Sequence, residues 1–261
     1  MKISVSNIAW SAEYDEEMYC WLKENGVGGL EIAPSRIFGS MPYEHIPEAA
    51  QLRMRLREEF GLEISSMQSI LFGISENLFA SETDRAFLRE YLGKACAFAE
   101  TVGCGNLVFG CPKNRRRDGR SLSVGREFFA ELADAAETCG THMAIEANPV
   151  IYNTDYINRT DEAFALSEDI GRAGITVNLD MGTVIYNGED LSRVAENMGR
   201  ISHVHISEPY LAPVEKRDIH RELAEILAYN GYDRFVSVEM KNQERLDDVK
   251  RAVSYVQEVF A

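Results

Sequence analysis

The chain alternates short β-rich segments with longer segments of helical periodicity. Eight segments carry the β-branched and apolar residues typical of strands, at 2–10, 28–34, 62–70, 106–110, 142–148, 175–180, 201–207 and 235–240. Apolar residues at helical spacing lie between them, at 14–25, 47–60, 81–103, 125–139, 161–170, 191–198, 217–229 and 245–260. The pattern therefore predicts eight successive strand–helix units.

Eight such units without a Pro/Ser-rich linker predict one closed (β/α)8 TIM barrel domain over residues 1–261. Glycines just past the predicted helices favour the same boundaries, because a helix often ends on a left-handed residue. These glycines are Gly26, Gly61, Gly103, Gly140, Gly174 and Gly231. A doubly wound open sheet is the alternative. It usually carries a Gly-rich loop after its first strand, and the segment IAWSAEYDEE has no glycine.

The last four predicted strands alternate apolar and polar residues instead of being apolar throughout. In ISHVHISE (201–208), His203 and His205 share one face of the strand, and the apolar residues share the other. The same alternation places Glu146, Asp180 and Glu239 near the carboxyl ends of their strands. In a barrel the polar positions face the lumen, and active sites lie at the carboxyl ends of the strands. We therefore expect these side chains to converge.

Converging carboxylates inside a protein are costly unless a counter-charge compensates them. Strands five to seven contain no lysine or arginine of matching parity. A single divalent metal ion bound by Glu146, Asp180, His205 and Glu239 resolves the conflict. An oxygen-rich donor set favours Mn²⁺, Mg²⁺ or Co²⁺, and suits Zn²⁺ less clearly. His203, one pleat deeper, either supports a ligand or is a hydrogen-bonded core histidine.

The net charge, 27 − 42 = −15, disfavours binding to nucleic-acid phosphate or to anionic membranes, although acidity also serves solubility. Five scattered cysteines without a CxxC pair indicate reduced thiols. The first residues show no signal-peptide pattern, and no apolar stretch is long enough to span a bilayer. A cytoplasmic protein with a small-molecule partner is the simplest expectation.

Four segments resemble a known family: IEANP (145–149), NLDMGT (178–183), HVHISE (203–208) and SVEM (237–240). They are similar to the sugar phosphate isomerase/epimerase group of xylose isomerase-like TIM barrels, in the AP endonuclease 2 superfamily. The resemblance covers nearly the whole chain. It implies the same four metal ligands, with Glu146 and Glu239 as the catalytic acid/base pair. It also implies a carbohydrate substrate, and barrels of this family are often dimers or tetramers.

The implied reaction passes through an enediolate. A metal chelated by a carbonyl and the adjacent hydroxyl acidifies the neighbouring C–H, and one glutamate removes that proton. Return of a proton to the opposite face gives an epimer, and return to the adjacent carbon gives an isomer. A keto-polyol dehydratase on the same site is an alternative. So is a noncatalytic sugar-binding subunit, which Thr183 favours, because many relatives have histidine there. Five histidines and the acidity argue against a three-zinc DNA-repair enzyme.

Several further residues are candidates for binding the substrate. The loop CPKNRRRDGR (111–120) holds five of the 27 basic residues and either grips a phosphate or carboxylate or is simply solvated. Lys113 and Arg115 are favoured there, because some relatives carry a similar PKNR stretch. The other candidates, which otherwise serve as helix caps or loop supports, are Glu208, His220, Glu31 and Gln68, with Tyr152 and Asn187 in the adjoining loops.

Overall fold

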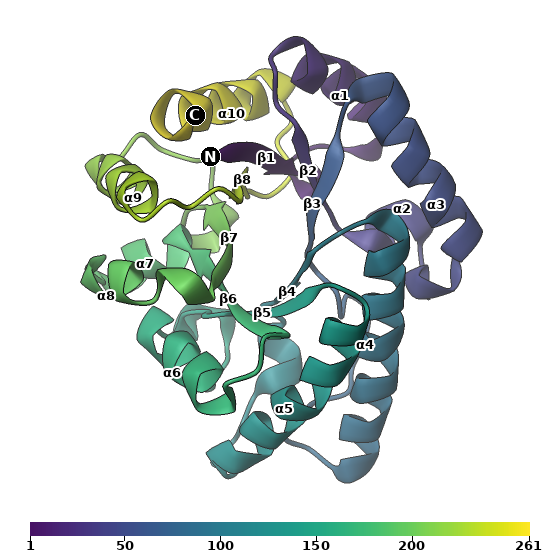
Figure 1. The fold of residues 1–261 in the computed structure, drawn as a ribbon, viewed down its shortest axis with the longest axis vertical. Helices are drawn as coiled ribbons and strands as arrows, with labels where there is room; N and C mark the ends of the chain where they lie inside the picture. Colours follow the sequence, from purple (N-terminus) through teal and green to yellow (C-terminus); the bar gives the residue numbers. More distant parts are fainter.

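The computed structural model describes residues 1–261 and contains a closed barrel of eight parallel strands, each paired with the next (Figure 1). The strands are β1 (Lys2–Ser6), β2 (Gly29–Ile32), β3 (Glu63–Met67), β4 (Asn106–Phe109), β5 (His142–Glu146), β6 (Ile175–Asp180), β7 (Ile201–Ile206) and β8 (Phe235–Val238). Strand β8 closes the barrel by pairing with β1. The predicted (β/α)8 TIM barrel is confirmed, and each predicted strand segment contains one strand.

Helices cover the outside of the barrel (Figure 1). They are α1 (Asp15–Glu24), α2 (Pro34–Phe38), α3 (Ile46–Arg55), α4 (Glu82–Val102), α5 (Leu122–Thr138), α6 (Thr160–Ile170), α7 (Met181–Asn187), α8 (Ser192–Glu196), α9 (Asp218–Tyr229) and α10 (Leu246–Phe260). Every predicted helical segment overlaps one of them, and α5 begins three residues before its predicted segment. The short helices α2 and α7 were not predicted. Helix α7 begins directly after β6, where the Asp180 side chain accepts the backbone N–H of Thr183 at 2.7 Å and caps the helix.

The lumen of the barrel is filled largely by polar side chains that pair with one another. The Ser4 and Ser65 hydroxyl oxygens lie 2.6 Å apart. Asn106 Nδ2 donates to the Ser66 hydroxyl at 2.9 Å, and the Ser202 hydroxyl donates to Asn106 Oδ1 at 2.6 Å. Buried polar groups are tolerated when their hydrogen bonds are satisfied in this way. The apolar parity of the strands packs outward against the helices, which explains the alternation along the last four strands.

One of the glycine predictions was wrong. Helix α6 ends at Gly171, whose φ is +64°, and not at Gly174. Gly174 instead allows a close approach, because an added Cβ would lie 2.5 Å from the Ala133 carbonyl oxygen. The cysteines are free thiols. None of the helices combines the length and the apolar character that crossing a membrane requires.

Candidate metal centre

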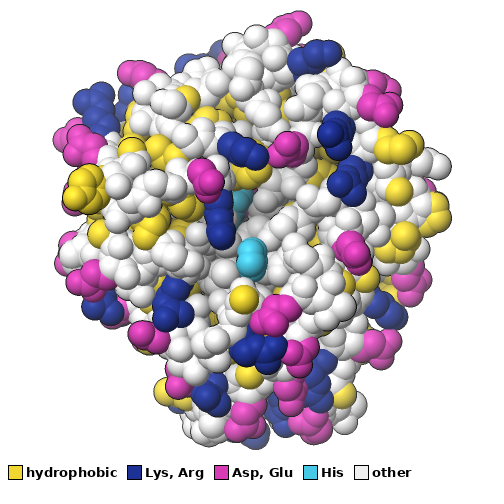
Figure 2. Space-filling model, in the orientation of Figure 1, with side chains coloured by type: hydrophobic (Ala, Val, Ile, Leu, Met, Phe, Trp, Pro, Cys, Tyr) yellow, Lys and Arg dark blue, Asp and Glu magenta, His cyan; other side chains and the backbone are white.

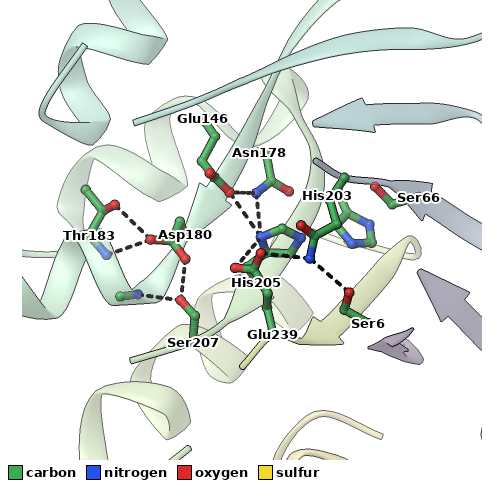
Figure 3. A network of polar contacts seen from close by, with 12 residues as sticks. Ser6, Ser66, Glu146, Asn178, Asp180, Thr183, His203, His205, Ser207 and Glu239 are labelled. Carbon is green, nitrogen blue, oxygen red and sulfur yellow. Dashed lines mark hydrogen bonds and ion pairs between the residues drawn. The ribbon is translucent and has the colours of Figure 1, made fainter. Parts of the chain in front are cut away.

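The carboxyl end of the barrel brings four side chains into one buried cluster (Figure 3). They come from different strands: Glu146 ends β5, Asp180 ends β6, His205 lies in β7, and Glu239 follows β8. The parallel register places Asp180 beside His205. One donor atom from each of the four lies within 4.8 Å of all the others.

The His205 imidazole is held from both sides. Its Nδ1 faces the cluster, 3.0 Å from Glu146 Oε1 and 3.1 Å from Glu239 Oε2. Its Nε2–H donates to Glu31 Oε2 at 2.8 Å, on the side away from the cluster. A carboxylate behind a histidine ligand commonly fixes the orientation and tautomer of the ring. His203 Nε2 lies 3.3 Å from the same Glu31 oxygen, so this second histidine belongs to the support of the site.

Glu146 has both carboxylate oxygens positioned by amides. Asn178 Nδ2 donates to Oε1 at 2.7 Å, and Asn148 Nδ2 donates to Oε2 at 2.9 Å. A Cβ added at Gly110 would lie 2.5 Å from Glu146 Oε2, so the carboxylate occupies space that only glycine leaves open. Sequence reasoning assigned no role to the two asparagines. The signal was present, because each lies two residues from a predicted ligand and therefore shares its strand face.

The other two carboxylates have separate supports. Asp180 accepts the Ser207 hydroxyl at Oδ1 and the Thr183 backbone N–H at Oδ2. Glu239 Oε1 accepts Gln68 Nε2–H at 3.0 Å. Thr183 is fully buried, so its position supports the aspartate and does not face a substrate.

The cluster carries more negative charge than its own groups neutralise. Burial and the charge of Glu146 raise the pKa of Asp180 to about 6. Burial also raises the pKa of Glu239 to about 7, although His205 opposes that shift. For His205, burial acts to lower the pKa, but the surrounding carboxylates outweigh it and raise the pKa well above the ordinary value. A divalent cation compensates such a site, and this oxygen-rich donor set fits one.

A cavity of about 530 Å³ lies over the cluster. Glu146, Asp180 and Glu239 line it together with Gln68, Lys113, Tyr152 and an apolar group of Leu71, Phe72, Ile74 and Leu211. The Phe72 side chain is exposed. The volume is within the range of small-ligand pockets.

Comparison with known proteins gives the family. A family model described as xylose isomerase-like TIM barrel matches residues 20–259. The chain belongs to this family. Among curated proteins, no sequence matches it.

Several solved structures share the fold. A D-psicose 3-epimerase in the presence of D-fructose has a TM-score of 0.80 and 16% identity, covering 100% of this chain and 99% of that chain. A 3-keto-D-glucoside 4-epimerase from E. coli has a TM-score of 0.76 and 19% identity, covering 99% of this chain and 98% of that chain. A family 2 AP endonuclease from Brucella melitensis has a TM-score of 0.77 and 20% identity, covering 100% of this chain and 99% of that chain. A probable 3-DHS dehydratase from Bacillus anthracis also shares the fold, with a TM-score of 0.74 and 15% identity, covering 98% and 99%.

At these identities the likeness shows the fold alone. The neighbours of this xylose isomerase-like barrel include sugar epimerases and a dehydratase.

Of the residues expected to bind substrate, Gln68 and Lys113 line the cavity and Glu31 does not. Glu31 is fully buried beneath the cluster. Its two histidine neighbours hold its pKa well below the usual range, although burial acts to raise it. The expectation that Glu31 contacts substrate is therefore corrected to a role behind His205. Tyr152 also lines the cavity, whereas Asn187 does not.

Arg115, Glu208 and His220 also lie outside the cavity lining. Arg115 is fully buried and donates to the Glu146 carbonyl oxygen at 2.8 Å and to Asn148 Oδ1 at 2.8 Å. This buried guanidinium braces the end of β5, and the same burial lowers its pKa to about 10. Its expected contact with a substrate anion is corrected accordingly.

Glu208 and His220 are engaged by neighbouring side chains. Glu208 Oε2 accepts Arg217 Nη2–H at 2.6 Å, and Oε1 accepts its Nε–H at 2.7 Å. His220 is fully buried with Nδ1 3.1 Å from the Tyr255 hydroxyl, and burial lowers its pKa to about 4. The structure assigns both residues to packing between the loop after β7 and the last two helices.

Proposed function

We propose that the protein is a divalent-metal-dependent epimerase or isomerase of a small sugar or sugar phosphate. The observation that carries the proposal is that Glu146 and Glu239 approach His205 Nδ1 from different sides and both line the cavity (Figure 3). A pair of carboxylates in this position is able to serve both faces of one substrate carbon. The wall of the cavity also presents the Gln68 amide and the Lys113 ammonium for hydroxyl and anionic groups.

Glu146, Asp180, His205 and Glu239 would hold the metal ion. When bound, a divalent cation supplies Lewis-acid activation of a carbonyl and its adjacent hydroxyl, which acidifies the neighbouring C–H. Among Mn²⁺, Mg²⁺, Co²⁺ and Zn²⁺, the three carboxylates favour the first three.

The protein side chains then move the proton. One glutamate accepts it from carbon, and the other delivers a proton to the opposite face for epimerisation. Return of the proton to the neighbouring carbon gives isomerisation instead. The amides of Asn148 and Asn178 hold Glu146 for this transfer, and the Gln68 amide holds Glu239. Positioned acid–base groups typically contribute ~10²–10⁴-fold in rate.

The test is solvent-hydrogen exchange. The protein is incubated in D₂O with Mn²⁺ and a panel of ketoses, aldoses and their phosphates, and deuterium incorporation is measured. We expect Glu146→Gln and Glu239→Gln each to lower incorporation by ~10²–10⁴-fold while the circular dichroism spectrum persists. Glu222→Gln, on the exposed face of α9, is the matched control and should exchange like the wild type. Near wild-type exchange in either site variant would reject the assigned roles.

A dehydratase using the same residues is the second candidate. The Bacillus anthracis neighbour carries this name on the same fold. Mass spectrometry separates the two, because loss of water excludes simple isomerisation. Absence of exchange with a sugar that demonstrably binds would instead favour a noncatalytic sugar-binding protein.

A further inference from the structure

A second cavity, of about 540 Å³, lies at the opposite, amino end of the barrel. Figure 2 shows this face, with a central hollow bordered by basic and acidic side chains. The cationic residues of the lining are Lys2, Arg53, Arg57 and Arg234, and the acidic ones are Glu63 and Asp233. The lining charge is therefore 4 − 2 = +2, in a chain whose net charge is −15.

Three of these cations have no carboxylate partner. Lys2 contacts Glu63 at 3.4 Å, but Arg53, Arg57 and Arg234 have no acidic oxygen within 4.0 Å. Arginines on the outer helices behave differently. Arg89 and Arg172 each contact two carboxylates. A chain with so many acidic groups thus leaves three guanidinium groups unpaired around one cavity.

The chain positions part of this array through backbone contacts. Arg53 Nη1 donates to the Thr101 carbonyl oxygen at 3.2 Å. A Cβ at Gly103 would lie 2.6 Å from the Arg53 guanidinium carbon, so glycine makes room for the arginine. These contacts use only part of the donor capacity, because each guanidinium has five N–H groups.

The inner wall of the cavity is polar and already hydrogen-bonded. Ser65, Asn106 and Ser202 line it, and they are the same side chains that pair within the lumen. His142 Nδ1–H donates to the Ala173 carbonyl oxygen at 3.1 Å, which leaves Nε2 as an acceptor for a ligand hydroxyl. The wall therefore suits a ligand that carries hydroxyl groups as well as negative charge.

We propose that the amino-end cavity binds a small phosphate-bearing molecule through Arg53, Arg57 and Arg234. Forked guanidinium groups match phosphate oxygens in geometry and charge. The volume exceeds that of a bare phosphate ion and is within the range of pockets for small organic ligands. This site is independent of the metal centre and of the function proposed for it.

Isothermal titration of the full chain at low ionic strength tests the proposal. The probes are inorganic phosphate, glucose 6-phosphate and unphosphorylated glucose. We expect saturable binding of at least one of the two phosphate probes. Comparison of inorganic phosphate with glucose 6-phosphate shows whether the site takes the free ion or an organic phosphate. Arg57→Gln and Arg234→Gln should each weaken binding by ~10-fold or more, since each removes a charge-assisted contact. Arg57→Lys, which keeps the charge and loses the fork, should weaken it less.

Two controls locate the site. Arg221→Gln removes an exposed arginine without an ion pair outside the cavity, and Lys113→Gln removes the cation of the metal-centre pocket. Arg221→Gln should bind the phosphate probes like the wild type, whereas Lys113→Gln reports any probe that binds in the metal-centre pocket instead. The proposal is overturned if the folded wild type shows no saturable binding of either phosphate probe. It is also overturned if Lys113→Gln abolishes binding while Arg57→Gln and Arg234→Gln retain it.

Discussion

The two ends of the barrel have cavities of nearly equal volume and opposite charge. The carboxyl end, of about 530 Å³, presents Glu146, Asp180 and Glu239, whereas the amino end, of about 540 Å³, gathers unpaired arginines. Between them the lumen holds neutral polar pairs such as Ser4 and Ser65, and the buried Glu31 carboxylate there is paired with His203 and His205. Ions are costly in the middle of a protein and tolerable at an opening where a ligand or water compensates them. The net charge of −15 therefore does not predict the positive charge of the amino end.

The two ends also differ in how tightly their charges are held. Each carboxylate of the candidate metal centre accepts hydrogen bonds from named neighbours, as Glu146 does from Asn148 and Asn178. Most of the guanidinium N–H groups at the amino end lack a protein acceptor. A centre that performs chemistry needs fixed geometry, whereas a site that only binds an anion tolerates mobile side chains.

Among the substitutions that test this comparison, the largest effect is expected from Gly110→Ala at the carboxyl end. The new Cβ would lie 2.5 Å from Glu146 Oε2 and would displace that carboxylate. A displacement of about 1 Å in a catalytic group costs about 10²-fold in rate, so deuterium exchange should fall by that order. Phosphate titration at the amino end should be unchanged. Undiminished exchange would mean that the position of Glu146 does not limit the reaction.

Glu31→Gln tests whether Glu31 supports the His205 ring or contacts the substrate. Glu31 Oε2 accepts the His205 Nε2–H, and loss of such a partner typically weakens metal binding by about 10–100-fold. Mn²⁺ titration followed by electron paramagnetic resonance would measure the change. Weaker sugar binding at unaltered Mn²⁺ affinity would contradict the role assigned here.

The affinity for Mn²⁺ should depend on pH through the buried carboxylates at the carboxyl end of the barrel. Metal binding requires deprotonated ligands, and burial raises the pKa of Asp180 to about 6 and that of Glu239 to about 7. Affinity should therefore fall about tenfold or more as pH decreases from 8 to 6. The linked effect on the metal-free fold has the opposite sign. Because the folded pKa values are raised, these groups stabilise the fold below about pH 4, and that contribution is lost as pH rises through 7.

Thermal unfolding at several pH values checks this linkage. The increase in melting temperature caused by Mn²⁺ should be larger at pH 8 than at pH 6. Comparison of the wild type with Glu239→Gln isolates the glutamate from the other titrating groups. A metal-induced shift independent of pH would show that protons and the metal do not compete for these ligands.

The smallest effect is expected from Glu63→Gln at the amino end. Glu63 forms only an exposed pair with Lys2, so unfolding free energy should change by less than about 1 kcal/mol. Removing its negative charge should strengthen phosphate binding by about two- to fivefold at low salt, and added salt should suppress the gain. Calorimetry at two ionic strengths would test both parts, and weaker binding would argue against an anion in this cavity.

Prediction from sequence worked best where a residue's role follows from its parity on a strand. The alternation in β7 alone indicates that His203 and His205 face the lumen, and the strand ends place the three carboxylates at one rim. It worked poorly for residues whose contacts come from distant segments. Arg115 was expected to grip an anion, but it is buried between the loop after β4 and the end of β5.

The amino-end cavity illustrates the same limit. Its arginines come from α3, from the helical turn that follows α3 and from the residue before β8, and they share no motif or strand parity. Sequence inspection found the basic run at 111–120 and passed over Arg53, Arg57 and Arg234, because isolated cations give no local signal.

The amino-acid sequence by itself determined the eight-unit barrel and the four candidate metal ligands, because period and parity are local properties that survive folding. Only the tertiary structure decided that Glu31 lies behind His205, that Arg115 braces Glu146, and that unpaired arginines meet at the far end. These outcomes depend on which side chains from separate strands and loops come within hydrogen-bonding distance. Barrel closure sets that proximity, and the linear order of residues does not encode it directly.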